Sequence, residues 1–228
     1  GTLFVALIGD RFDAHDYRAA ALDAGAIAAV VRRGTPAVQG LSFYEVSDTL
    51  AAWGDLAHAR RRTITGPVIA ITGQNGKTST KEMVAAVLAT RWSVHATRSN
   101  NNNLVGVPLT ILEAPADTTA LVIEAGANQP GEIARYREII EPDIAIVLNA
   151  GSGHLAGFGT VERVAEEKLT LTRNVATAIV GVTPATLAAG ARAAGARRVI
   201  TAGLDHAEVA PDDVTLDDVA AVVADHVA

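Results

Sequence analysis

After residue 64, short apolar runs typical of buried strands alternate with longer segments whose apolar residues recur at helical spacing. We expect strands at residues 68–72, 92–95, 120–124, 144–148, 176–181 and 199–202. We expect helices between them at residues 77–90, 105–113, 131–140, 161–172 and 184–194. This alternation predicts an α/β fold with a mostly parallel sheet that helices cover on both faces. Ligands of such sheets bind beyond the carboxyl ends of the strands.

The first 62 residues repeat the pattern on a smaller scale. Strands are expected at residues 3–8, 27–31 and 41–46, and helices at residues 15–24, ended by Gly25, and 47–62, capped by Ser47. The cationic run at residues 60–62 suits a helix C-terminus and solvent better than phosphate binding. We therefore expect a small α/β domain at residues 1–64, a linker at 63–67, and a central domain at 65–228. An amphipathic helix at 217–227 would end the chain.

Composition narrows the class of protein. The chain has 228 residues, a net charge of −6 and no cysteine, so nucleic acid is not an expected partner and disulfides are excluded. No apolar run reaches the roughly 18 residues of a membrane span, and no signal peptide is visible. We expect a soluble, cytoplasmic protein without a membrane partner. Because the chain starts at Gly1 without Met, it reads as a trimmed or shortened sequence.

The segment VIAITGQNGKTS, residues 68–79, carries the strongest chemical signal. A strand, a glycine turn with free backbone N–H groups, and then Lys77 and Thr78 at a helix start suit a nucleotide triphosphate. The standard pattern G-x-x-x-x-G-K-[ST] would need glycine at Ile71, so this loop is shorter. A P-loop-type site would use Gly73, Asn75, Gly76, Lys77, Thr78 and Ser79. The alternative is an ordinary glycine turn with a solvated lysine.

Two residues near strand ends are candidate metal ligands. Glu124 closes an apolar run, where a carboxylate can bind Mg²⁺; the alternative is a capping or solvated strand-end acid. His154 lies in a glycine-rich loop after the strand at 144–148. It could ligate a metal or meet a phosphate, or be a polar surface residue.

Lys168 and an asparagine run leave two interpretations each. Lys168 falls on the apolar stripe of its expected helix, so it is either an active-site lysine or a side chain that snorkels to water. The run at residues 100–103, which includes Asn102 and Asn103, is either a flexible turn or the lining of a substrate groove.

Five ordered segments resemble motifs of the Mur ligase family, the ATP-dependent enzymes that add amino acids or peptides to the peptidoglycan precursor. They read LFVALIGDRFDAHDY, ITGQNGKTSTKEM, NNLVGVPLTIL, VIEAGANQPGEI and EPDIAIVLNAGSGHLAGFGT. The resemblance covers about residues 3–202. It is greatest to the branch that joins D-Ala-D-Ala to UDP-MurNAc-tripeptide.

The resemblance implies a role for each matched position. Lys77 would hold the ATP phosphates, Thr78 and Glu124 would hold Mg²⁺, and His154 would serve a second Mg²⁺. Lys168 matches a lysine that many members carry as a carbamate, and Asn102 and Asn103 lie in the substrate-side segment. The implied reaction converts a substrate carboxylate to an acyl phosphate, from which an amino acid or dipeptide amine then displaces phosphate.

Three departures from the family pattern keep other hypotheses open. Gln129 replaces a histidine, Leu104 replaces a glutamate, and Gly181-Val-Thr-Pro184 replaces the segment expected near adenine. Family members also have a longer N-terminal domain and a third domain that closes over ATP. We expect the start of the first and all of the third to be missing from this sequence. The chain could therefore be a nucleotide-binding module that is inactive alone or takes its third domain from another protein. It could also be a ligase for a different acid–amine pair in secondary metabolism.

Overall fold

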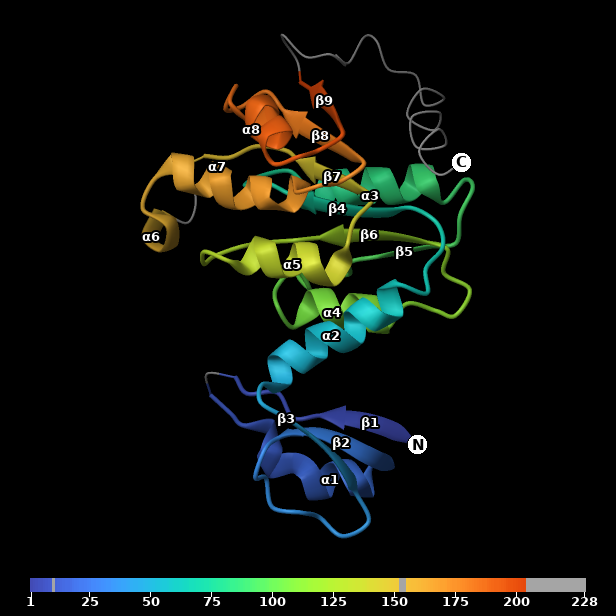
Figure 1. Cartoon of the computed structure of the whole chain (residues 1–228). Coiled ribbons are helices and arrows are strands. Elements are labelled where there is room, and N and C mark those ends of the chain that lie inside the picture. Colours follow the sequence, from blue (N-terminus) through green and yellow to red (C-terminus); the bar gives the residue numbers. More distant parts are fainter. Residues whose placement is uncertain (10, 152–154, 204–228) are drawn as a thin grey trace. The chain divides into compact units, whose positions relative to one another are not determined.

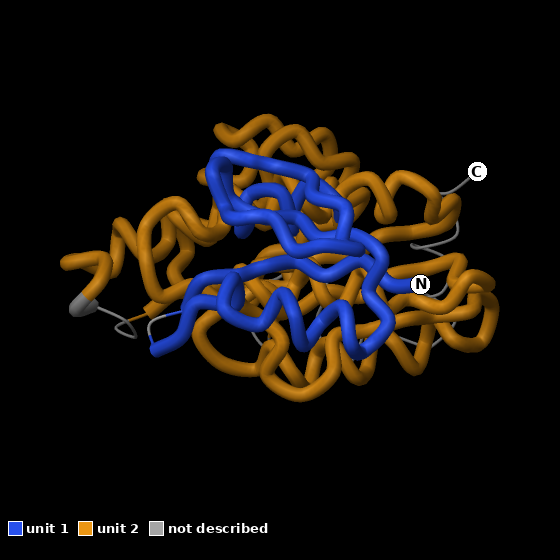
Figure 2. The backbone as a smooth tube through the Cα atoms, turned by 90° about the horizontal axis from the view of Figure 1, so that it is seen from below, with its two compact units in different colours: residues 1–56 blue, residues 57–228 orange. Residues whose placement is uncertain are grey.

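The computed structural model describes residues 1–9, 11–151 and 155–203. The chain divides into two compact units, residues 1–56 and residues 57–228 (Figures 1 and 2). The predicted helix at 217–227 and His154 lie outside the described residues. Among the residues described, no helix has both the length and the apolar character that crossing a membrane requires.

Unit 1 is a small parallel α/β layer, as the sequence predicts. Its sheet has the order β1-β2-β3 and packs around Ala6, Ala29, Val31 and Leu41. The predicted helix at 15–24 is a 3-10 turn followed by an α-helix, and Gly25, at φ +96°, follows it. The elements are β1 (Thr2–Val5), η1 (Ala14–Tyr17), α1 (Arg18–Asp23), β2 (Ala26–Arg32) and β3 (Ser42–Val46).

A buried histidine joins the η1 turn to β2. His15 is 6% exposed, and its Nε2 accepts a hydrogen bond from the backbone N–H of Arg32 at 2.9 Å. The proton of the neutral ring therefore lies on Nδ1, which is 2.5 Å from Asp13 Oδ1. Hydrogen bonds from His15, first from its backbone N–H, lower the pKa of Asp13. In the RFDAHDY segment, Asp13 and His15 thus stabilise the local fold.

Helix α2 (Thr49–Arg61) departs from the sequence prediction at both ends. Asp48, not Ser47, caps it: Asp48 Oδ1 accepts hydrogen bonds from the N–H groups of Leu50 and Ala51 at 2.8 and 3.0 Å. The prediction of a solvated arginine run is wrong for two of the three arginines. Arg60 donates to the carbonyls of Ala114 and Pro115, and Arg61 donates to those of Ile140 and Glu141. These carbonyls end or follow α4 and α5, where a helix leaves acceptors unsatisfied, and that of Pro115 also accepts from the N–H of Thr118.

Unit 2 contains a six-stranded parallel sheet in the order β5-β6-β4-β7-β8-β9. Its strands are β4 (Val68–Thr72), β5 (Val94–Ala96), β6 (Ala120–Glu124), β7 (Ile144–Val147), β8 (Thr177–Gly181) and β9 (Arg198–Ala202). Its helices include α3 (Lys77–Leu88), α4 (Gly106–Leu112), α5 (Glu132–Ile140), α6 (Leu155–Phe158), α7 (Val161–Leu169), η2 (Thr170–Thr172) and α8 (Leu187–Ala193). All six predicted strands form, and β4 and β6 have the predicted bounds. The predicted helix at 161–172 becomes α7 followed by the η2 turn.

Each face of this sheet forms a hydrophobic core with the helices that cover it. Ala70, Ile123 and Ala145 face the side on which α4, α5, α7 and α8 pack (Figure 1). Isoleucines such as Ile69 and Ile71 face the side that α3 covers with Val84 and Leu88. Alternation along each strand sends successive side chains to opposite faces, so both cores come from the same short runs. β4 lies between β6 and β7, which places the carboxyl ends of three strands around the loop that follows β4.

Candidate nucleotide and metal site

The loop between β4 and α3 is shaped by two glycines. A Cβ atom at Gly73 would lie 2.9 Å from Leu148 Cβ, so a side chain there would collide with the neighbouring strand. Gly76 takes φ +83° as the N-cap residue of α3, and no side chain caps this helix start. The N–H groups of Lys77, Thr78 and Ser79 are in the first turn, where an α-helix has no internal acceptors for them. This geometry suits an anion at the start of α3.

Two of the loop N–H groups that the sequence predicts to be free are not. The N–H groups of Gln74 and Asn75 donate to Asn149 Oδ1 at 2.9 and 3.1 Å, and Asn149 Nδ2 donates back to Asn75 O at 3.2 Å. Asn149 follows β7, so a side chain from the next strand fixes the shape of the loop. The backbone N–H of Asn75 is therefore not free to bind a phosphate.

Lys77 folds back over its own loop. Its Nζ donates to the carbonyls of Gly73 and Gln74 at 3.0 and 3.1 Å, and the side chain is partly buried. This geometry excludes the alternative of a fully solvated lysine. The ammonium group is held at the carboxyl end of β4, beside the open first turn of α3.

Glu124 lies beside this loop because β6 pairs with β4, with Glu124 opposite Ile71. It is 2% exposed, which rules out a solvated strand-end acid. Its Oε2 accepts from Thr78 Oγ1 at 3.0 Å, its Oε1 accepts from Asn102 Nδ2 at 2.8 Å, and its backbone N–H donates to Thr97 Oγ1 at 2.9 Å. The sequence prediction that Thr78 and Glu124 lie together is therefore consistent with the geometry.

These oxygen donors fit Mg²⁺ better than a transition metal. In the described part of the chain, no three His, Cys, Asp or Glu side chains gather closely enough to hold a metal ion. Mg²⁺ usually keeps several waters and binds one or two carboxylates together with substrate phosphates. One buried carboxylate and a hydroxyl beside an anion site match that requirement.

Lys168 reaches the same loop from α7. It is 3% exposed, and its Nζ lies 3.2 Å from Gly73 O, so the snorkelling interpretation is wrong. Burial first, and then the nearby charge of Lys77, lower its pKa to about 8. Glu167 opposes this shift with a smaller effect, and within the described residues the ammonium group forms no ion pair. Two lysines 91 positions apart in sequence thus meet at one carbonyl group.

A pocket of about 150 Å³ opens between these elements. Its lining combines the two lysines with the asparagine turn and the segment after β6: Gly73, Lys77, Asn102, Asn103, Gly126, Ala127, Asn128, Glu132 and Lys168. Asn103 also supports the turn that leads into α4, because its Oδ1 accepts from the N–H groups of Val105 and Gly106 at 3.1 and 2.8 Å. The asparagine run is therefore a hydrogen-bonded turn and part of a pocket wall at once.

The pocket wall is fixed by two carboxylates at the start of α5. Glu132 Oε2 accepts from the N–H groups of Asn128 and Gln129 at 2.6 and 2.9 Å. Glu167, the neighbour of Lys168, accepts from the N–H groups of Gly131 and Ile133 at 3.0 and 2.9 Å.

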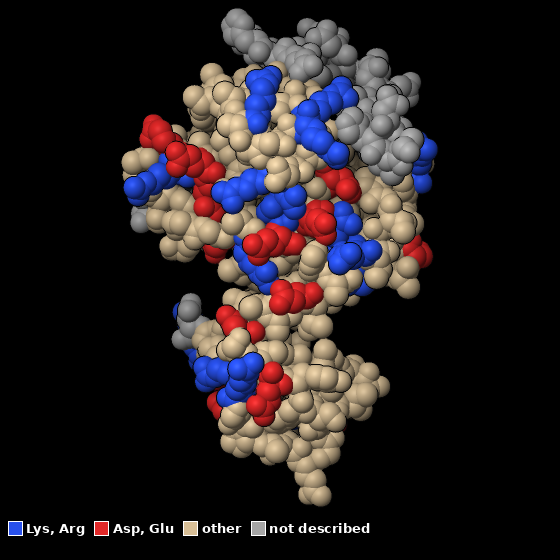
Figure 3. Space-filling model, viewed as in Figure 1, with Lys and Arg blue, Asp and Glu red and all other residues tan. Residues whose placement is uncertain are grey.

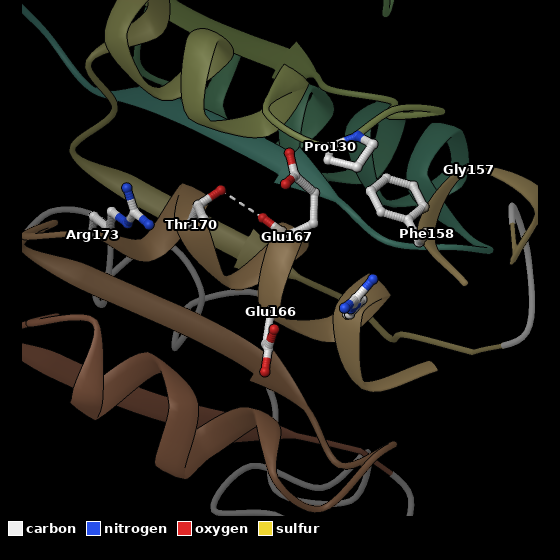
Figure 4. A pocket seen from close by; sticks show the side chains of 8 residues that line it. Pro130, Gly157, Phe158, Glu166, Glu167, Thr170 and Arg173 are labelled. Carbon is white, nitrogen blue, oxygen red and sulfur yellow. Dashed lines mark hydrogen bonds between the residues drawn. The ribbon is translucent and has the colours of Figure 1, made fainter. Parts of the chain in front are cut away.

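A second, separate hollow, of about 380 Å³, is lined by none of the predicted site residues. Figure 4 shows Glu167 beside Pro130 in this hollow.

Sequence reasoning missed Asn149, Thr97 and Lys81. Asn149 and Thr97 are polar residues just past apolar strands, as Glu124 is at the end of one, so the same signal was present. Lys81 is 3% exposed and shares a helical stripe with Val84 and Leu88, the criterion that identified Lys168. Composition adds a further signal: of 19 basic residues only three are lysines, and these are Lys77, Lys81 and Lys168. On the face shown in Figure 3, the Lys and Arg side chains of unit 2 are interspersed with Asp and Glu.

The loop after the central strand is shaped by two glycines and suits an anion, and a buried carboxylate and two lysines surround it. These features are typical of a nucleotide-binding α/β domain. The family model described as "Mur ligase middle domain" matches residues 71–224, and the chain belongs to the Mur ligase family. The chain is a MurF-like member of this family.

Curated relatives support that placement. The UDP-N-acetylmuramoyl-tripeptide–D-alanyl-D-alanine ligase of Escherichia coli (strain K12) is 44% identical over 168 residues, covering 74% of this chain and 37% of the relative. The ligase of the same name from Synechocystis sp. is 38% identical over 213 residues, 92% of this chain and 47% of the relative. The chain thus spans about half or less of the length of these relatives.

Solved structures agree. A crystal structure of MurF from Acinetobacter baumannii matches 99% of this chain and 56% of its own with a TM-score of 0.85 and 30% identity. MurF from Thermotoga maritima in complex with ADP matches 91% of this chain and 48% of its own, with a TM-score of 0.82 and 33% identity. The α/β fold with a parallel central sheet is therefore confirmed.

Proposed function

We propose that this chain provides the nucleotide and metal site of a MurF-type ligase, an ATP- and Mg²⁺-dependent enzyme that forms an amide bond. The observation that carries the proposal is the convergence of Lys77, Lys168 and the Thr78–Glu124 pair on the loop at Gly73. Its parts come from β4, α3, β6 and α7, so a chance surface turn does not explain it. The ADP complex of the Thermotoga relative adds support for a nucleotide at this fold.

Each residue would have a distinct role with ATP bound. The first-turn N–H groups of α3 and the Lys77 ammonium would hold the phosphates, exchanging the loop carbonyls for a stronger anionic partner. Thr78 and Glu124 would hold Mg²⁺, which neutralises phosphate charge and orients the phosphoryl group. His154, outside the described residues, stays a proposed ligand of a second Mg²⁺.

The proposed reaction balances in two steps. An oxygen of the acceptor carboxylate attacks the γ-phosphorus, and the bond to the β-phosphate oxygen breaks. The products of this step are an acyl phosphate and ADP. The incoming amine then attacks the carbonyl carbon, loses a proton, and expels inorganic phosphate as the amide forms. The site contributes positioning and positive charge, here from Lys77.

Lys168 is proposed to carry a carbamate. Its neutral amine would attack CO₂, forming an N–C bond and releasing one proton, and a buried cation would become an anion. The physical support is that Lys168 lies beside Lys77 in a buried position, where its pKa falls to about 8 and a neutral amine is accessible. As a carbamate it would attract Lys77 instead of repelling it, and it could ligate Mg²⁺.

The substrates proposed are those in the relatives' names, a UDP-N-acetylmuramoyl-tripeptide as the acid and D-alanyl-D-alanine as the amine. Asn102 and Asn103 would contact the acid from the pocket wall. Residues 1–64 would belong to the substrate-binding domain and 65–228 to the ATP-binding domain. A cytoplasmic location and a third domain, in this polypeptide or another, are part of the proposal.

Calorimetry of ATP binding with Mg²⁺ tests the nucleotide site. We expect Lys77→Ala to weaken binding by about 10- to 100-fold, since a charge-assisted contact contributes about 1.5–3 kcal/mol. Arg197→Ala, which removes an exposed charge just before β9, is the matched control and should bind as the unchanged chain does. Equal affinity in the Lys77 variant would sink the site assignment.

Phosphate release with both named substrates tests the reaction itself. Turnover dependent on acid, amine and ATP together supports the full proposal. Nucleotide binding with turnover only on another acid–amine pair would reject the named substrates while keeping the ligase chemistry.

The carbamate has a direct spectroscopic test. With ¹³C-bicarbonate present, we expect one carbamate carbonyl signal that disappears in Lys168→Arg but persists in Lys81→Arg. Because the chain has only three lysines, selective labelling of their side chains gives three assignable signals. An unmodified Lys168 ammonium at saturating bicarbonate would refute the carbamate.

A further inference from the structure

Lys81 is a buried lysine that the proposed reaction does not use. It lies in α3, one turn after Thr78, and is 3% exposed. Its Nζ donates to the carbonyl oxygen of Thr97 at 2.7 Å and contacts Glu82 Oε1 at 2.5 Å. Burying an ammonium group is costly unless hydrogen bonds and a counter-charge satisfy it. The contact with a backbone carbonyl is therefore a specific arrangement.

Thr97 connects this lysine to the metal-binding carboxylate. It follows β5 and is 1% exposed. Its N–H donates to Val122 O at 3.0 Å, and its hydroxyl oxygen accepts from the Glu124 N–H at 2.9 Å. The carbonyl of Thr97 is thus held by Lys81 while its hydroxyl holds Glu124, so a shift of Thr97 is transmitted to the end of β6.

These contacts close a ring. From α3, Lys81 reaches Thr97, Thr97 holds Glu124, and Glu124 accepts from Thr78, which is back on α3. Thr78 and Lys81 are three positions apart and lie on one side of the helix. One turn of α3 therefore holds Glu124 at two points: Thr78 binds its side-chain oxygen, and Lys81 acts through Thr97 on its backbone N–H.

A direct role with phosphate fits Lys81 less well. Its side chain is buried, whereas that of Lys77 is partly exposed, and Lys81 is not among the residues that line the pocket at Gly73. A purely structural role, in which the side chain only fills space, does not require the lysine to meet this particular carbonyl.

We propose that Lys81 is a positioning residue that acts through Thr97 to fix Glu124 for Mg²⁺. The inference rests on the proposed function, since the metal role of Glu124 is part of it. Removal of a group that orients a metal ligand typically weakens metal affinity by about 10- to 100-fold. That loss should appear in metal-linked binding more than in binding of the free nucleotide.

Amide hydrogen exchange tests the positioning without any nucleotide. In Lys81→Met we expect the Glu124 N–H to exchange about tenfold faster or more, while the amides of Leu121 to Ile123 stay protected. Glu82→Gln is the matched control, because it removes the exposed counter-ion and leaves the Thr97 contact. Unchanged exchange at Glu124 in a folded Lys81→Met would overturn the proposal.

Metal-linked affinity supplies the functional readout. Binding of a non-hydrolysable ATP analogue is measured with Mg²⁺ and again with EDTA. The ratio compared between variants is the dissociation constant with EDTA divided by that with Mg²⁺. We expect Lys81→Met to lower the ratio about 10- to 100-fold, with EDTA affinity unchanged and partial recovery in Lys81→Arg. In a Glu124→Gln background the Lys81 substitution should have no further effect on the ratio. An equal loss in both backgrounds would mark a general structural role and reject the relay.

Two further results keep the outcomes separate. If Lys81→Met does not fold, Thr97→Val against Thr97→Ser tests the second link of the relay, since both keep the carbonyl that binds Lys81 and only serine keeps the hydroxyl that binds Glu124. Equal ratios in these two variants would reject the relay. If the unchanged chain binds no nucleotide, the proposed function fails, and the exchange rate at Glu124 still decides whether Lys81 positions it.

Discussion

The α3 side and the α7 side of the proposed nucleotide site each bury one lysine to the same extent, 3% exposure, but surround it differently. On the α3 side, Lys81 has a carbonyl at 2.7 Å and a carboxylate at 2.5 Å. On the α7 side, Lys168 has a carbonyl at 3.2 Å and another lysine nearby. Exposure alone therefore does not describe a buried lysine; its neighbours decide whether the charge is stabilised.

The difference separates two uses of one side chain. A satisfied ammonium such as that of Lys81 is suited to hold a structure in place. The ammonium of Lys168 forms no ion pair among the described residues, and the charge of Glu167 only partly offsets burial and Lys77. Such a group raises the free energy of the folded state until it loses its proton, binds an anion, or is modified. Strain of this kind gathers at functional sites. The unsatisfied lysine is thus the one assigned to chemistry.

The largest effect is expected from Lys168→Met in CO₂-free buffer at pH 7. The pKa of Lys168 falls from 10.5 to about 8, which corresponds to a cost of about 3 kcal/mol for the charged form. Methionine fills the space without a charge, so the free energy of unfolding should rise by up to about that amount. Denaturant unfolding measures it. A loss of stability would show that the lysine is satisfied after all.

The same variant has a signed pH dependence. Between pH 8 and 10.5 the unfolded chain binds more protons at Lys168 than the folded chain, so the stability of the unchanged protein rises with pH. The advantage of Lys168→Met should be full below about pH 8 and vanish above about pH 10.5. A constant advantage across this range would place its origin in packing and not in charge.

An opposite sign is expected on the α3 side. Lys81→Met should lower the free energy of unfolding by about 2 kcal/mol, because the Thr97 carbonyl stays buried and loses its charged donor. Urea titrations of the two methionine variants under one condition give the comparison. If both variants move in the same direction, the contrast between the two sides is wrong.

The smallest effect is expected from Glu82→Gln. The carboxylate of Glu82 is 68% exposed, and exposed ion pairs contribute about 0–1 kcal/mol. A loss below 1 kcal/mol, reduced further by salt, would show that the Thr97 carbonyl stabilises Lys81 more than the counter-ion does. A loss as large as that of Lys81→Met would reverse that order.

The strands of unit 2 were predictable because most are short, largely apolar runs, such as the buried residues 69–71, 121–123 and 144–147. Helix ends were less so. Ser47 and Asp48 are adjacent residues of types that both cap helices well, so residue type alone does not select Asp48. The roles of Arg60 and Arg61 depend on carbonyls more than 50 positions away, which no local pattern specifies.

The site was predictable as a set of residues but not as a network. Glu124 and Lys168 stand out as charges in apolar surroundings, and family motifs supported them. Asn149 does not, because an asparagine after a strand is also a common turn residue. Its role appears only when the sheet order places β7 beside β4. Lys81 was predictable by periodicity and was overlooked because it lies next to a conspicuous motif.

The central position of β4 has a consequence for the order in which the protein is made. Its neighbours β6 and β7 are synthesised about 50 and 75 residues after it, and Lys168 meets Gly73 across 95 positions. When only the glycine loop of the nascent chain has emerged from the ribosome, Glu124, Asn149 and Lys168 have not yet joined it. We expect the ribosome-bound chain to acquire nucleotide affinity late, after α7 has left the exit tunnel.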